Sequence, residues 1–152
     1  MPFTMQVQGF PAGGALPREF TCEGVNHSPA LTWSGAPAGT KSFALIMDDP
    51  DAPGGVWSHW LLWNIPASVS GLEENARPHR PIRSGMNDFG KPGYGGPCPP
   101  QGHGPHRYFF RLFAVDVKDL GLSNGTRRSE LDRILVPHIL DQAEYMGRFE
   151  RK

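Results

Sequence analysis

Residues 42–65 read SFALIMDDPDAPGGVWSHWLLWNI, and this stretch decides the fold class. It contains two nearly continuous apolar runs of strand length, Ser42 to Met47 and Val56 to Ile65. Such runs are typical of strands buried on both faces. The three carboxylates between the runs are costly to desolvate. Turn chemistry accounts for part of this charge, because Asp side chains bond nearby backbone N–H groups and Pro fixes φ. The negative charge that turn chemistry leaves unexplained indicates that this turn has a functional role as well as a structural one.

Strand patterns dominate the rest of the chain. Arg107 to Val117 is rich in aromatic and β-branched residues, and Phe3 to Val7 and Leu31 to Ser34 are shorter candidates. Helical spacing is clear only from Ser129 to about Met146, where Pro137 predicts a kink or two short helices. No βαβ alternation is visible, so the predicted class is mainly β with one helix near the C-terminus.

Composition excludes several classes of protein. At 152 residues and 16.7 kDa, the chain is predicted to form a single domain spanning residues 1–152. The 15 basic and 15 acidic residues balance, and apart from Arg127-Arg128 no basic cluster stands out, so nucleic acid is not an expected partner. No run of 18 apolar residues is present, so no membrane span is expected, and the predicted location is cytoplasmic.

Cys22 and Cys98 are the two cysteines of the chain. Two cysteines make neither a disulfide scaffold nor a four-ligand zinc site. The favoured interpretation is a pair of reduced, partly buried thiols, because cytosolic thiols normally stay reduced. A bridge between them stays open, since pairing cannot be deduced from sequence.

A long connection runs from Pro78 to Pro105 and contains seven Gly and seven Pro. A loop of this length in a compact protein is usually functional. Within it, residues 85–100 are predicted to be ordered and to wall a site, with Phe89 and Tyr94 as aromatic anchors.

The strand that begins at His106 is expected to carry site residues. Period-two geometry places His106 and Tyr108 on one face and Arg107 on the other. Arg107 is therefore interpreted as structural, pairing with a loop carboxylate.

The preceding apolar strand carries a second histidine. Strict alternation gives Trp57 and His59 a face shared with Leu61 and Trp63. If the two histidine strands are neighbours, polar groups converge at one end of the sheet: His59, His106, Tyr108, Asp49 and Asp51. A few convergent polar groups in an apolar surround are typical of a small-ligand site.

Several motifs occur in order along the chain: Cys22-Glu23-Gly24 with Ser28-Pro29, Leu31-Thr32-Trp33, Asp49 to Pro53, His59-Trp60 with Asn64, Asn87 to Gly90, Tyr94 to Pro100, and Gly104 to Tyr108. From about Phe3 to Phe149 the chain resembles the phosphatidylethanolamine-binding protein family, also called Raf-kinase-inhibitor-like, in its bacterial and archaeal branch. The resemblance implies a large antiparallel sheet packed against a smaller one with Greek-key connections. Together with the strand geometry it suggests these ligand-binding residues: Asp49, Asp51, Pro53, Trp57, His59, Pro99, Pro100, His106 and Tyr108.

Imidazole and phenol donors suit an oxyanion, and His⁺ makes charge-assisted hydrogen bonds to phosphate. Asp49 either accepts a histidine ring N–H or contacts an ammonium, as in an ethanolamine head group. Members of the family hold phosphate-like anions or phosphoethanolamine, which suits both interpretations. The expected function is thus a non-enzymatic binding protein with a phosphate or phosphoethanolamine-like ligand, and no cofactor or bound metal is expected.

The resemblance suggests regulation of a protein partner such as a kinase or protease, although no residue identifies that partner. The Trp-rich strands could supply a homodimer interface. The alternative is a small hydrolase that uses the Asp/His cluster, with or without a metal. Against it, the chain has no Gly-x-Ser-x-Gly elbow, and Ser58 is expected to point away from His59.

Overall fold

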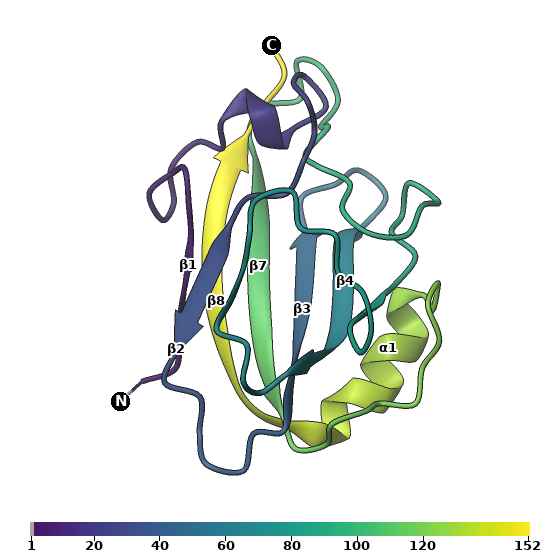
Figure 1. Ribbon diagram of the computed structural model, residues 1–152. Helices are drawn as coiled ribbons and strands as arrows, with labels where there is room; N and C mark the ends of the chain where they lie inside the picture. The colour runs from purple at the N-terminus through teal and green to yellow at the C-terminus, as the bar shows by residue number, and fades with distance from the viewer. Residues whose placement is uncertain (1) are drawn as a thin grey trace.

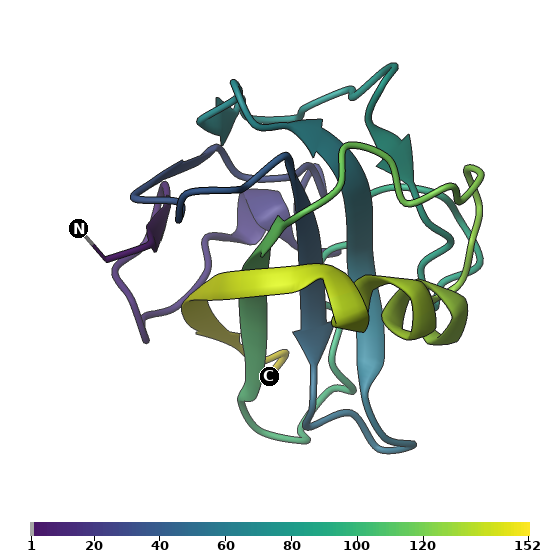
Figure 2. The same ribbon diagram turned by 90° about the horizontal axis from the view of Figure 1, so that it is seen from below.

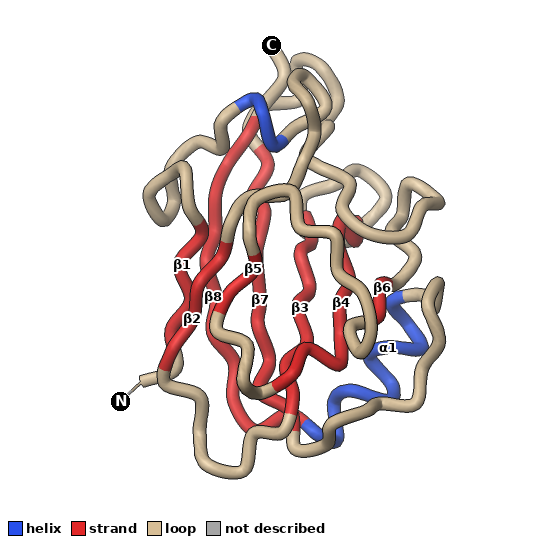
Figure 3. Tube along the Cα trace, viewed as in Figure 1, coloured by secondary structure: helices blue, strands red, loops and turns tan. Residues whose placement is uncertain are grey.

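The computed structural model describes residues 2–152. Its strands form two antiparallel sheets (Figures 1 and 3). The smaller sheet has the order β1-β2-β5, with bounds Thr4–Val7, Leu31–Ser34 and Gly71–Leu72. The larger has the order β6-β4-β3-β7-β8, with bounds Arg83–Ser84, Trp57–Pro66, Ser42–Asp49, His106–Val115 and Ile139–Phe149. The helices are η1 (Arg18–Phe20), α1 (Arg128–Leu135) and η2 (Val136–His138).

Both faces of the five-stranded sheet are covered, which explains the continuous apolar runs of β3 and β4. One face packs against the small sheet, through residues such as Leu45 and Tyr108. The other packs against α1, through residues such as Ile46 and Leu131. Figure 2 shows α1 beside β4 and apart from β1. The mainly β class with one helix near the C-terminus is confirmed.

The strand β4 does not alternate strictly. Met47 pairs with Trp60 but Asp48 pairs with Ser58, so His59 is an extra residue in a bulge. The bulge shifts the side-chain phase: Trp60 belongs to the core between the sheets, whereas Leu61 lies on the helix side. The predicted shared face of His59 with Leu61 and Trp63 is therefore wrong.

The predicted helix from Ser129 to Met146 is wrong in its second half. The helical segment ends with η2 at His138, and β8 follows directly. Pro137 lacks a backbone N–H donor, which favours the end of the helix there. Beyond it, Ala143, Tyr145 and Phe149 are buried at period-two spacing, and β8 pairs with β7 along its length.

Cys22 and Cys98 form a disulfide, so the expectation of reduced thiols is wrong. The chain around the two cysteines is held together by the backbone as well. Cys22 donates its N–H to the Pro97 carbonyl at 3.1 Å, and Gly96 donates to Asn26 Oδ1 at 2.9 Å. None of the helices in residues 2–152 is long and apolar enough to cross a membrane.

Candidate ligand-binding site

The candidate site lies where β3 ends and β4 and β7 begin. Because β3 is antiparallel to both neighbours, Asp49, Trp57 and His106 lie at the same end of the sheet. The strands that carry His59 and His106 are not neighbours, since β3 lies between them. They are close enough nonetheless, with the rings of His59 and Tyr108 5.3 Å apart. Loops gather around this end (Figure 3).

A cavity of about 190 Å³ opens here, and it is called the strand-end pocket below. All the predicted site residues except Asp51 line it. Its lining is Asp49, Ala52, Pro53, Trp57, His59, Phe89, Cys98, Pro99, Pro100, His106 and Tyr108. The volume is below the range of about 300–1,000 Å³ for drug-sized ligands.

Asp49 and two histidines form a chain of contacts along one wall. The buried His106 Nδ1 lies 2.6 Å from Asp49 Oδ2, and its Nε2 lies 2.6 Å from Nδ1 of the exposed His103. Asp49 Oδ1 also accepts the Asp51 backbone N–H at 2.7 Å. The geometry thus agrees with the interpretation in which Asp49 accepts a histidine ring N–H, fixing the His106 tautomer.

His59 also lines the pocket. Its Nδ1 lies 2.6 Å from the Gly95 carbonyl oxygen, to which it donates. Burial lowers the pKa of His59, against the opposing effects of this hydrogen bond and of nearby Asp49. The imidazole is therefore neutral near pH 7, which leaves a lone pair on Nε2.

Tyr108 contributes a donor without a partner. Its side chain is fully buried, and its hydroxyl has no hydrogen-bond partner among residues 2–152. Burial, together with the negative charge of Asp49 and the closeness of its carboxylate to the hydroxyl, raises the pKa of Tyr108, so the phenol keeps its proton. A buried unpaired hydroxyl is unfavourable unless something else accepts its hydrogen bond.

Asp51 is placed outside the pocket, contrary to prediction. Its carboxylate accepts hydrogen bonds from Arg107 Nε and Nη2, both at 2.9 Å, and from the Arg107 backbone N–H. The arginine contact lowers the pKa of Asp51 to about 2. The expected pairing of Arg107 with a loop carboxylate is seen here, and it braces the turn between β3 and β4 against β7.

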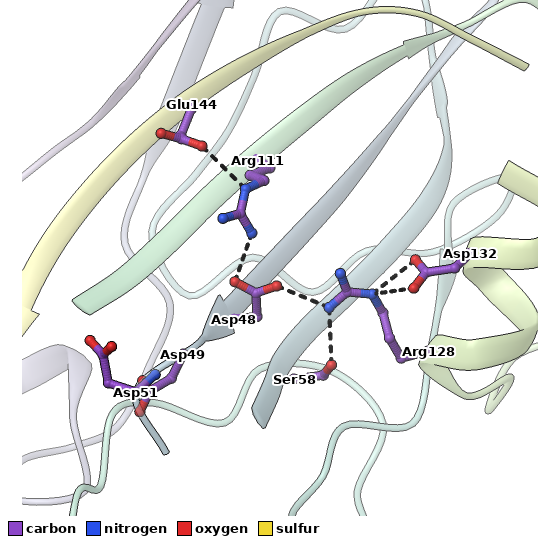
Figure 4. Close-up of polar contacts among 8 residues, drawn as sticks. All are labelled: Asp48, Asp49, Asp51, Ser58, Arg111, Arg128, Asp132 and Glu144. Atoms are coloured by element: carbon purple, nitrogen blue, oxygen red, sulfur yellow. Dashed lines mark hydrogen bonds and ion pairs between the residues drawn. The ribbon is translucent and has the colours of Figure 1, made fainter. Parts of the chain in front are cut away.

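Asp48 and Ser58 precede Asp49 and His59 in the sequence, and their side chains point to the face of the sheet that packs against α1. The buried Asp48 accepts from Arg111 Nη1 at 2.8 Å and from Arg128 Nη1 at 3.1 Å (Figure 4). Arg128 Nη1 also donates to Ser58 Oγ at 3.2 Å, so Ser58 does point away from His59. Two further carboxylates complete the network, Glu144 on Arg111 and Asp132 on Arg128.

Two residues contact the predicted site histidines although the sequence pattern did not predict these contacts. His103 lies in the loop before β7 and is exposed, yet it contacts His106. Phe89 was expected only as a loop anchor, and its ring packs edge-on against His59 at 5.3 Å. The spacing of His103 and His106, three residues apart across Gly104-Pro105, was the available signal.

One group in residues 2–152 has three potential metal ligands close together, Glu19, His27 and Glu74. It lies outside the strand-end pocket. Within this group, His27 Nε2 lies 3.1 Å from a Glu74 oxygen.

Two packed antiparallel sheets with a His/Asp/Tyr cavity at the strand ends define the class of protein. The family model of the phosphatidylethanolamine-binding protein matches residues 6–150. The chain belongs to this family.

Individual relatives agree with this assignment. A UPF0098 protein of Aquifex aeolicus is 47% identical over 148 residues, which is 95% of this chain and 86% of that protein. The crystal structure of Escherichia coli YbcL, described as a new member of the mammalian PEBP family, has a TM-score of 0.95 at 36% identity and full coverage of both chains. A Chlamydia trachomatis homologue of the phosphatidylethanolamine-binding protein has a TM-score of 0.90 at 36% identity, covering 99% of this chain and 98% of that chain.

Proposed function

We propose that this protein is a non-enzymatic binding protein whose strand-end pocket holds a phosphate-type anion or a phosphoethanolamine-like head group. The unpaired hydroxyl of Tyr108 carries the proposal, because a bound oxyanion would accept its hydrogen bond. His59 and His106 line the same small cavity and supply further donors when protonated.

The anion would enter where His103 now contacts His106. In the free protein both ring nitrogens of His106 are engaged, by Asp49 and by His103. Displacing the exposed His103 frees His106 Nε2, which can donate to the ligand once the ring is protonated, because Nδ1 already donates to Asp49. Asp49 does not face the anion as an unpaired carboxylate, because its two oxygens already accept hydrogen bonds from His106 and from the Asp51 N–H. An ammonium group on the ligand could contact the Asp49 carboxylate, which lines the same pocket.

We expect sulfate to bind more tightly at pH 5.5 than at pH 8. Neutral His59 donates through Nδ1 to Gly95, so its Nε2 must gain a proton before it can donate to an anion. A bound anion favours the charged imidazole, so affinity is greatest below the free-site pKa and weakens as pH rises through the bound-site value. Sulfate avoids the second ionisation of phosphate near pH ~6.

Calorimetric titration of sulfate into the wild type, His59→Ala, His106→Ala and Tyr108→Phe tests the pocket. Each substitution should weaken binding by about 1.5–3 kcal/mol, the range for hydrogen bonds to charged groups. Circular dichroism confirms that each variant is folded. Equal affinity in all four proteins would place the anion elsewhere, and affinity that rises with pH would exclude histidine protonation as the cause. Turnover of phosphoesters by the wild type would favour a hydrolase instead.

The proposal includes a kinase or protease as the regulated partner, and a homodimer as the assembly. A cytoplasmic location also stays a prediction. The Cys22–Cys98 disulfide weighs against it, because disulfides are rare in reducing compartments.

A further inference from the structure

A second cavity lies at the opposite end of the five-stranded sheet, and it is rich in positive charge. Its volume is about 550 Å³, and it is called the basic cavity below. It lies where β3 begins and β4 ends, at the lower end of the sheet in Figure 1. The lining is Lys41, Asn64, Pro66, Ala67, Ser68, Arg80, Pro81, Arg83, Lys118 and Asp119.

The four cations of the basic cavity have no partners within residues 2–152. No side-chain hydrogen bond or ion pair joins Lys41, Arg80, Arg83 or Lys118 to another of these residues. Some arginines elsewhere in residues 2–152 are paired, as Arg107 is with Asp51, whereas others, such as Arg148, have no ion pair within these residues. Four unpaired like charges around one concavity repel one another and make a field that attracts anions.

Asp119, the one carboxylate of the lining, is already engaged. Its Oδ1 accepts from the Gly121 N–H at 2.8 Å and from Asn64 Nδ2 at 3.0 Å. These hydrogen bonds, with the charge of Arg83, lower the pKa of Asp119, so it stays ionised. One carboxylate against four cations leaves the basic cavity strongly positive.

The floor of the basic cavity is fixed before any ligand arrives. The buried Asn64 adopts a left-handed backbone, with φ 59°, and its Oδ1 accepts the Leu120 N–H at 2.9 Å. This ties the segment that carries Lys118 to the end of β4. Lys41 is held by its backbone N–H, which donates to the Val115 carbonyl at 2.8 Å. The backbone that carries these two cations is therefore positioned in advance, which lowers the entropic cost of binding.

We propose that the basic cavity binds a small organic polyanion, a molecule with two or more phosphate or carboxylate groups. The volume falls in the range of small-ligand sites, about 300–1,000 Å³. Guanidinium groups of Arg80 and Arg83 match phosphate and carboxylate oxygens in pairs. Pro66, Ala67 and Pro81 give an apolar wall for the carbon part of the ligand. This site is separate from the strand-end pocket and does not depend on its function.

Pyrophosphate and citrate are the probes, because they show whether the cavity prefers a ligand with phosphate groups or one with carboxylate groups. Calorimetric titration at low salt compares the wild type with Arg83→Gln, Lys118→Gln and the double variant. Each single change should weaken binding about three- to tenfold, and the double change about ten- to a hundredfold. Without ligand, the double variant should melt no lower than the wild type at low salt, since like-charge repulsion is relieved.

Arg148→Gln is the matched control, because this exposed cation lies on β8 beside the start of β7, at the far end of the sheet. It should bind both probes as the wild type does. His106→Ala should keep the affinity that Lys118→Gln loses, which separates this site from the strand-end pocket. Unchanged affinity in the double variant, or binding of a hexaglutamate peptide without binding of either probe, would overturn the proposal.

Discussion

Replacing both cysteines, as Cys22→Ser with Cys98→Ser, should lower the free energy of unfolding by about 4–5 kcal/mol. The bridged residues are 76 apart in sequence, and closing a loop of that length restricts the unfolded chain by about this amount in the chain-entropy description. Measured values for native disulfides span about 2–5 kcal/mol. Urea unfolding of the two proteins at equal concentration measures the difference.

Reduction of the wild type by dithiothreitol is the control, and it should reproduce most of the loss without any substitution. The change should also weaken anion binding, because Cys98 lines the strand-end pocket. If the wild type unfolds at the same urea concentration with and without reductant, the disulfide does not stabilise this protein.

Replacing Asp48 with asparagine should lower the free energy of unfolding by about 3 kcal/mol. Asp48 is 3% exposed and is the shared partner of Arg111 and Arg128. Breaking a buried pair at one partner typically costs about 3–5 kcal/mol, because the remaining charge is left without compensation. The lower figure applies since Glu144 and Asp132 still face these arginines. Urea unfolding at neutral pH measures the effect.

Asp132→Asn is the matched control on the same network (Figure 4). The Asp132 side chain is 44% exposed, and exposed ion pairs contribute only about 0–1 kcal/mol. Its effect should therefore be at most about a third of that of Asp48→Asn. Equal effects of the two changes would mean that burial of Asp48 does not set its contribution.

The local sequence pattern was sufficient to predict a strand and its faces wherever buried residues follow a regular spacing along a short segment. The apolar run from Ser42 predicted β3, and alternation from His106 predicted the face that Tyr108 shares with the pocket. The site prediction rested on the same logic, because residues at strand ends gather at one edge of a sheet. This logic did not place Asp51 correctly. Its carboxylate turns to Arg107 instead of the pocket, and that contact joins residues 56 positions apart in the sequence.

The sequence by itself determined the mainly β class, the face shared by His106 and Tyr108, and the Asp-rich turn, because apolar periodicity and turn chemistry are local. Tertiary structure alone decided the bulge at His59, the strand that replaces the second half of the expected helix, and the disulfide. It also gathered Lys41, Arg83 and Lys118 into the basic cavity, although they are scattered along the chain. These features depend on which distant segments pack together. Ala143, for example, favours a helix by its intrinsic propensity, and only its pairing with Leu112 of β7 places it in a strand.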